Sequence, residues 1–113
     1  MVAVYNPSLD KAKSVADAHN IPQASDCLED ILAMPDVQAV SISTPPFLHY
    51  EMAQQVLQAG KHLLLEKPMT LSATETRDLY HLAKKQGVVA MPDFEFRFVP
   101  PWQLLAEHLE SGY

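Results

Sequence analysis

The sequence predicts an α/β domain built on a parallel sheet, and two features of the chain support this fold class. Short apolar runs alternate with longer segments in which apolar residues recur at helical spacing. In addition, Leu63–Leu65 and Val88–Ala90 are apolar at every position. Such runs are typical of parallel strands that helices cover on both faces.

The predicted strands and helices alternate along the whole chain. Strands are expected at Val2–Tyr5, Pro22–Ser25, Val37–Ser43, Lys61–Leu65 and Val88–Met91. Helices are expected over Pro7–Asn20, Asp26–Ala33, the segment around Met52–Leu57 that ends at Gly60, Ser72–Gly87 and Pro100–Ser111.

Capping residues support three of the helix starts. Asn6 precedes a proline and is predicted to be the N-cap of the first helix. The spacing of Asp26 with Glu29, and of Ser72 with Glu75, is that of a capping box. We therefore expect both pairs to stabilise the helices that follow them.

Composition excludes several classes of protein. The 113 residues, 48% hydrophobic and 19% charged, suit one globular domain, and no apolar run approaches the roughly 20 residues that span a bilayer. Eight Lys+Arg against 14 Asp+Glu give a net charge of −6, which argues against nucleic acid or an anionic membrane as partner. The start at Met1 shows no signal sequence. A lone cysteine, Cys27, allows no internal disulfide, so a reducing cytoplasm is the expected location.

The loops that follow the predicted strands are the candidate ligand site, because parallel sheets bind ligands beyond the carboxyl ends of their strands. Three such loops are Tyr5–Pro7, Thr44–Pro46 and Glu66–Pro68. Lys67 follows a buried strand and has a carboxylate beside it. Partial burial would lower its pKa from about 10.4 and suit it to proton transfer. The alternative is an ordinary surface lysine at the end of a strand.

Five motifs occur together, in this order: Thr44-Pro45-Pro46, His49, Ala59-Gly60-Lys61-His62, Glu66-Lys67-Pro68 and Arg97-Phe98-Val99-Pro100. In combination they resemble the glucose–fructose oxidoreductase / inositol dehydrogenase (Gfo/Idh/MocA) family, whose members join a Rossmann domain to an open-faced α/β domain. The resemblance runs from Val2 to about Pro100. It implies that residues 1–92 form a partial NAD(P)-binding Rossmann domain and that residues 93–113 begin a C-terminal substrate domain.

The resemblance also implies an activity, because members of this family move hydride between NAD(P) and a sugar, polyol or related alcohol. Lys67 matches the family's lysine that assists proton transfer at the reacting hydroxyl or carbonyl. Glu66 matches its neighbour on the nicotinamide side, and Pro68 matches a proline whose preceding peptide bond is often cis. The implied partner is a small sugar or polyol.

Other residues match cofactor-binding positions of the family. Thr44 and Pro45 match the loop along the nicotinamide ribose, and His49 begins the next helix. Asn6 ends the strand at which the adenosine ribose is read. An amide there repels a 2′-phosphate less than the usual acid, so the choice between NAD and NADP stays open. Arg97 matches an arginine near the nicotinamide or substrate.

Each of these positions also has a purely structural interpretation. Thr44–Pro46 could simply end a strand, and His49 could be a polar residue at a helix start. Arg97 lies in Phe94–Phe98, whose alternation equally suits a strand with Glu95 and Arg97 on its polar face. The histidines form no metal-binding motif, so no metal is expected.

The glycine-rich G-x-G-x-x-G turn of dinucleotide-binding domains is absent. Relative to the family, Met1 corresponds to the start of the second strand, so the first strand, its glycine turn and its helix have no counterpart. The strands at Val2–Tyr5 and Val37–Ser43 would then lose the strand between them. We expect a compromised cofactor site and little or no dehydrogenase activity from the chain alone.

Two alternatives stay open at this point. The chain could be an inactive truncated relic, or a subunit that a homo-oligomer or another chain completes by pairing with its open strand edge. A different NAD-dependent reaction, such as redox-assisted glycoside cleavage, is the weaker alternative.

Overall fold

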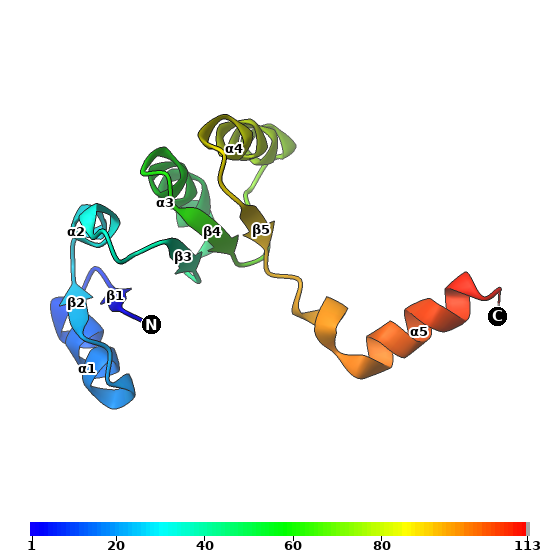
Figure 1. The fold of residues 1–113 in the computed structure, drawn as a ribbon, viewed down its shortest axis with the longest axis horizontal. Coiled ribbons are helices and arrows are strands. Elements are labelled where there is room, and N and C mark those ends of the chain that lie inside the picture. The colour runs from blue at the N-terminus through cyan, green and yellow to red at the C-terminus, as the bar shows by residue number, and fades with distance from the viewer. Residues whose placement is uncertain (113) are drawn as a thin grey trace.

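A computed structural model describes residues 1–112 and contains strands and helices in the predicted alternating order (Figure 1). Its elements are β1 (Ala3–Tyr5), α1 (Leu9–His19), β2 (Gln23–Ser25), α2 (Leu28–Ala33), β3 (Ala39–Ile42), α3 (Pro46–Gln58), β4 (His62–Leu65), α4 (Ala73–Gln86), β5 (Ala90–Pro92), the 3₁₀ helix η1 (Glu95–Phe98) and α5 (Pro100–Glu110). The predicted α/β class is confirmed.

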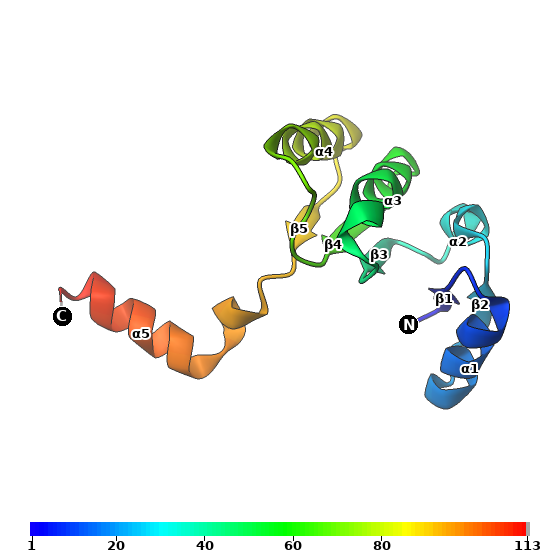
Figure 2. The same cartoon turned by 180° about the vertical axis from the view of Figure 1, so that it is seen from behind.

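The strands form two separate sheets. β1 pairs with β2, and β4 lies between β3 and β5; all of these pairings are parallel, as predicted. β1 and β3 are not hydrogen-bonded to each other, so within the described residues each has one unpaired edge. Figures 1 and 2 show β1 on the side of its sheet that faces β3. This is the interruption expected where the strand between them has no counterpart.

The hydrophobic core lies between β3–β4–β5 and the helices α3 and α4. Its buried members are Ile42, Ala53, Val56, Leu57, Leu63, Leu65, Leu79 and Ala83. Leu63 and Leu65 point into this core, whereas Leu64 is half-buried and Met91 is exposed. The prediction that helices cover both faces is therefore wrong for β3–β4–β5: within residues 1–112, only one face is covered. Figure 1 shows α2, α3 and α4 on one side of the strands and α1 on the other.

The chain is more extended than a compact domain of its length. Its radius of gyration is 16.5 Å, against about 13 Å expected for a compact domain. Much of the extension comes from α5, which projects from the sheets and packs mainly against η1. Trp102 and Leu109 of α5 are 53% and 65% exposed. No helix in the described part of the chain is both long and apolar enough to cross a membrane.

The capping predictions are partly confirmed. The Ser72 side chain accepts a hydrogen bond from the backbone N–H of Glu75 (3.2 Å), as predicted. The Glu75 carboxylate, however, accepts from the N–H of Leu71 rather than from that of Ser72. Asn20 and Gly87 end α1 and α4 in the left-handed conformation, with φ of 52° and 68°.

Two predicted helix starts are wrong. The N-cap of α1 is Ser8, because the Asn6 side chain instead accepts a hydrogen bond from the Ser8 N–H (2.9 Å) and closes a turn around the proline. The capping box of Asp26 and Glu29 does not form. Cys27 is the N-cap of α2, and its N–H donates to the Ser25 hydroxyl.

The alternative interpretation of Phe94–Phe98 as a strand is also wrong. The segment forms η1, in which the N–H of Arg97 donates to the Phe94 carbonyl (3.0 Å). The rings of Phe96 and Trp102 lie 5.8 Å apart and join η1 to α5. A period of two does not produce a strand here because no neighbouring strand pairs with this segment.

Candidate functional site

The carboxyl ends of β3, β4 and β5 lie side by side because backbone pairing continues past the strands. The N–H of Glu66 donates to the Ile42 carbonyl (3.0 Å), and the N–H of Asp93 donates to the Leu65 carbonyl (2.8 Å). These bonds align the segments that follow the three strands. Thr44, Lys67 and Glu95 lie in those segments, so one edge of the sheet collects the chemically active side chains.

Lys67 lies at the centre of this edge and is paired with acidic residues. Its ammonium nitrogen, Nζ, is 2.9 Å from Oε1 of Glu95 and 3.9 Å from Oε2 of Glu66. Its side chain is 45% exposed. The peptide bond between Lys67 and Pro68 is cis, the isomer that the family resemblance implied.

The prediction that burial lowers the pKa of Lys67 is wrong. The hydrogen bond that the Lys67 ammonium donates to Glu95 raises the pKa of Lys67 above its ordinary value, and the charges of Glu95, Glu66 and Asp93 add to the effect. Desolvation opposes this shift but is outweighed, because nearly half of the side chain is in water. Lys67 is therefore an ammonium ion at neutral pH.

Glu95 is the residue of this site that the sequence did not indicate as functional. Its hydrogen bond with Lys67 lowers the pKa of the Glu95 carboxyl, so the pair is a carboxylate and an ammonium ion. Glu95 belongs to η1, beyond β5, and the pair depends on the turn of η1. The sequence around Glu95 did not indicate its contact with Lys67, because the alternation in Phe94–Phe98 equally suited a strand, in which the Glu95 side chain would have another orientation.

His49 joins two of the loops. Its side chain is fully buried, with Nε2 2.7 Å from the Thr44 carbonyl oxygen and Nδ1 2.8 Å from the Pro68 carbonyl oxygen. The Thr44 hydroxyl donates to the sulfur of Met52 (3.6 Å), one helical turn further along α3. His49 thus links the loop after β3 to the loop after β4.

The structure brings together most, but not all, of the residues predicted for the site. Thr44, Pro45 and His49 lie against the loop of Glu66, Lys67 and Pro68 through the contacts of the histidine.

Asn6 follows β1 in the other sheet, where its N–H donates to the Ser25 carbonyl (3.2 Å). Arg97 is exposed in η1, and within residues 1–112 its guanidinium makes no hydrogen bond or ion pair, although its carbonyl accepts from Gln103. Neither residue touches Lys67 in the contacts of the described chain.

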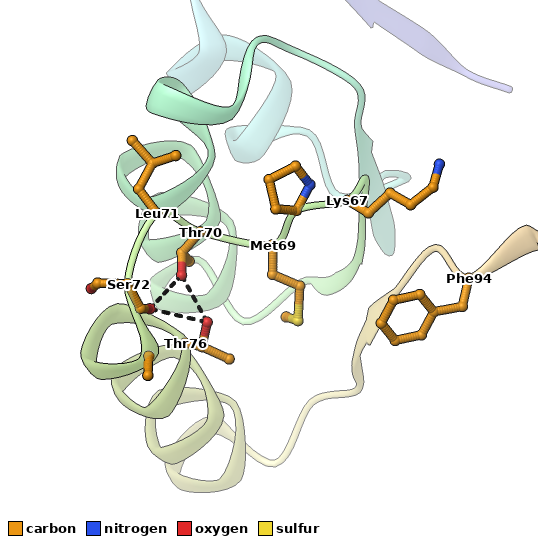
Figure 3. A pocket seen from close by; sticks show the side chains of 9 residues that line it. Lys67, Met69, Thr70, Leu71, Ser72, Thr76 and Phe94 are labelled. Atoms are coloured by element: carbon orange, nitrogen blue, oxygen red, sulfur yellow. Dashed lines mark hydrogen bonds between the residues drawn. The ribbon is translucent and has the colours of Figure 1, made fainter.

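A surface hollow of about 660 Å³ adjoins the lysine (Figure 3). Its lining residues are Lys67, Pro68, Met69, Thr70, Leu71, Ser72, Ala73, Thr76 and Phe94. The Thr70 hydroxyl bonds to the Ser72 carbonyl and to the Thr76 hydroxyl, both at 2.7 Å, which fixes the base of this hollow. Figure 3 shows the Lys67 side chain directed away from this threonine network.

The described residues fit one end of a dinucleotide better than the other. The loops of Thr44 and Lys67 offer polar groups at the carboxyl edge of the sheet. The three glycines, Gly60, Gly87 and Gly112, follow helix C-termini, so none opens a helix toward a pyrophosphate. Residues 1–112 contain no group of three or more His, Cys, Asp or Glu placed to hold a metal ion.

The parallel fold and the polar edge of the sheet define a nucleotide-binding α/β unit. The chain belongs to the Gfo/Idh/MocA oxidoreductase family with an NAD-binding Rossmann fold, whose family model matches residues 1–94. The predicted family is confirmed.

Individual relatives agree with this assignment. Over 111 residues the chain is 56% identical to the uncharacterized oxidoreductase sll0816 of Synechocystis sp.. The match covers 98% of this chain and 30% of that protein. It is 36% identical to the scyllo-inositol 2-dehydrogenase (NADP(+)) IolU of Bacillus subtilis, covering 98% of this chain and 34% of that protein. The chain thus spans about a third of the length of these curated relatives.

A solved structure has the same fold. KijD10, a 3-ketoreductase from Actinomadura kijaniata crystallised with TDP-benzene and NADP, superposes with a TM-score of 0.92 at 29% identity. The match covers 99% of this chain and 35% of KijD10. The two sheets and α5 of this chain are therefore arranged as in a larger, folded oxidoreductase.

Proposed function

We propose that this chain forms the nicotinamide side of an NAD(P)-dependent oxidoreductase that acts on a sugar, polyol or related secondary alcohol. Residues 1–92 are the partial NAD(P)-binding domain, and residues 93–113 begin the substrate domain. The observation that carries the proposal is the Lys67 ammonium, which is paired with Glu95 and lies in a loop that His49 joins to the loop of Thr44. The inositol dehydrogenase and the ketoreductase among its relatives support the substrate class.

Lys67 is assigned the proton transfer. Bound NAD(P) supplies or accepts the hydride. In the reducing direction, the Lys67 ammonium donates a proton to the substrate carbonyl oxygen as that oxygen gains negative charge. Oxidation requires Lys67 to be neutral when it accepts the hydroxyl proton. At neutral pH Lys67 is an ammonium ion, so it is in the form that can donate the proton in carbonyl reduction.

The remaining candidate residues are assigned to binding. Thr44 and Pro45 line the nicotinamide ribose, with Glu66 and Pro68 on the nicotinamide side. Asn6 reads the adenosine ribose with its amide, which is uncharged and so accepts either NAD or NADP.

Two further assignments concern neighbouring segments. His49 supports the loop of Thr44 from the start of α3. Arg97 lies at the entrance to the substrate domain, where its unpaired guanidinium is available to an anionic group of the substrate or cofactor.

The direct test is an assay of the protein as its gene encodes it. NADPH or NADH oxidation, followed at 340 nm with a panel of keto-sugars and keto-inositols, should reveal turnover, and the corresponding polyols should be oxidised in reverse. Binding of either nucleotide is measured separately by fluorescence. Failure to bind NAD and NADP alike would contradict the proposal.

Glu95→Gln should shift the pH dependence of carbonyl reduction. Glu95 raises the pKa of Lys67, so replacing its carboxylate with an amide should let this pKa fall. Lys67 then loses its proton at a lower pH, and the pH above which the rate declines should be lower than in the unmodified protein. The measurement is the pH profile of kcat/KM. Glu51→Gln, an exposed residue of α3, is the matched control and should leave the profile in place. An unshifted profile for Glu95→Gln would contradict the assigned role of Lys67.

The unpaired strand edges support a second candidate role, in which the chain is inactive alone and another chain completes it. β1 and β3 each lack a partner on one side within the described residues. A parallel strand supplied by a partner would satisfy both edges. Size-exclusion chromatography with light scattering separates the two cases, because a compact monomer contradicts completion by a second chain.

A further inference from the structure

His49 occupies an unusual position between two loops of the proposed site. Its side chain has no exposed surface, although histidine is a polar residue that is seldom fully buried. Both ring nitrogens contact backbone carbonyl oxygens, at 2.7 Å to Thr44 and 2.8 Å to Pro68. These two carbonyls belong to segments that follow different strands, β3 and β4.

The chemistry of these contacts is restrictive, because a carbonyl oxygen only accepts hydrogen bonds. A neutral imidazole donates from one nitrogen and would place the lone pair of the other against an oxygen. The imidazolium form donates from both nitrogens and satisfies both carbonyls. The two ring nitrogens therefore hold both loops at hydrogen-bonding distance at once, from one rigid ring.

The loop after β4 carries the reactive group. Pro68 is adjacent to Lys67, and Thr44 belongs to the loop assigned to the nicotinamide ribose. A change in either contact moves the backbone that carries the ammonium relative to the cofactor loop. Hydride and proton transfer depend on such separations, and a displacement of about 1 Å can cost about 10²-fold in rate.

We propose that His49 is a positioning residue, whose bonds to the Thr44 and Pro68 carbonyls fix the distance between the Lys67 loop and the nicotinamide loop. The inference rests on the proposed oxidoreductase function for its kinetic consequence. The two-sided hydrogen bonding is independent of that function. Because its side chain has no exposed surface, we assign His49 no direct contact with substrate or cofactor.

Two amide substitutions separate the two contacts. The side-chain nitrogen of asparagine occupies roughly the position of Nδ1, so His49→Asn keeps the bond to Pro68 and loses that to Thr44. The nitrogen of glutamine lies near Nε2, so His49→Gln keeps the bond to Thr44 and loses that to Pro68. In the protein as encoded, each variant should lower kcat by up to about 10²-fold while the KM for NAD(P)H changes little. The exposed His19→Asn is the control.

Hydrogen–deuterium exchange supplies a readout that does not need activity. Both variants should exchange faster in residues 44–48 and 67–71, whereas the N–H of Leu63, bonded to the Val89 carbonyl, should keep its protection. Unchanged exchange in both loops, together with unchanged kcat, would overturn the inference. If the unmodified protein binds no NAD(P) but both loops exchange faster in the His49 variants, the proposed function fails, whereas the role of His49 in joining the two loops is upheld.

The unmodified protein provides a test that does not depend on the folding of the variants. ¹⁵N NMR should show a ring N–H signal of His49 in slow exchange with water, because both ring nitrogens are buried against carbonyl oxygens. A ring with no protected N–H would overturn the two-sided link.

Discussion

Lys67→Met is expected to lower kcat for hydride transfer by about 10²–10⁴-fold, the range that a positioned general acid contributes. Methionine keeps much of the length of the side chain but carries no proton. Affinity for NAD(P) should change little, because the ammonium is paired with Glu95 rather than buried in the sheet. Steady-state kinetics and nucleotide fluorescence on the protein as encoded measure both quantities.

Lys13→Met is the matched control for this experiment. Lys13 is an exposed residue of α1, on the sheet that does not carry Lys67, and its replacement should leave kcat unchanged. A Lys67→Met variant that keeps its kcat would remove the lysine from the mechanism. The proton would then have to come from another group, and the proposal would lose the observation that carries it.

Leu65→Ala is expected to lower the free energy of unfolding by about 2–5 kcal/mol. Leu65 has no exposed surface, lies in β4 between β3 and β5, and belongs to the core under α3 and α4. Such a loss is large beside the roughly 5–15 kcal/mol that stabilises a typical domain. Urea unfolding followed by circular dichroism measures it.

Leu109→Ala is the control for the core substitution. Leu109 is 65% exposed in α5, so the same change should alter stability by no more than about 0.5 kcal/mol. Equal effects at the two positions would mean that the core of β3–β5 is not packed as described. A large loss at Leu109 alone would indicate that α5 is covered in solution.

The protonation of Lys67 determines how the rate of hydride transfer in the unmodified protein depends on pH. Glu95 comes from η1, the segment proposed to begin the substrate domain, so the lysine is held from the substrate side as well as from its own loop. Movement of η1 would release the ammonium and let the pKa of Lys67 fall. In the proposed division of the chain, the contact between Lys67 and Glu95 would couple the proposed proton donor to the position of the second domain.

The sequence predicted most of the local structure. The sequence located all five strands to within two residues at each end, because short apolar runs bounded by turn residues, such as Leu63–Leu65, favour strands over helices. Ser72 and Gly87 marked the ends of α4, since capping depends on neighbours within one turn. The boundaries failed where two local patterns competed, as at Asn6, whose side chain closes a turn instead of capping α1.

The motifs also identified which loops form the site, and the structure adds how they are held. His49 was expected at a helix start, among the cofactor-binding positions, and the structure shows that it is buried and contacts the carbonyls of Thr44 and Pro68. Both partners are backbone atoms, so no pairing of side-chain types in the sequence signalled the contact. The open face of β3–β5 was not predicted either, because an apolar run does not show which face of a strand a helix covers.

By itself, the sequence determined the order of elements, the parallel α/β class, the family and the position of Lys67 at the end of β4. These depend on periodicity and on residues close together in the chain. Only the tertiary structure decided the charge state of Lys67, because the carboxylate that holds its ammonium, Glu95, arrives from beyond another strand. Electrostatic energies depend on distance in space, and 28 positions of sequence separate these two residues.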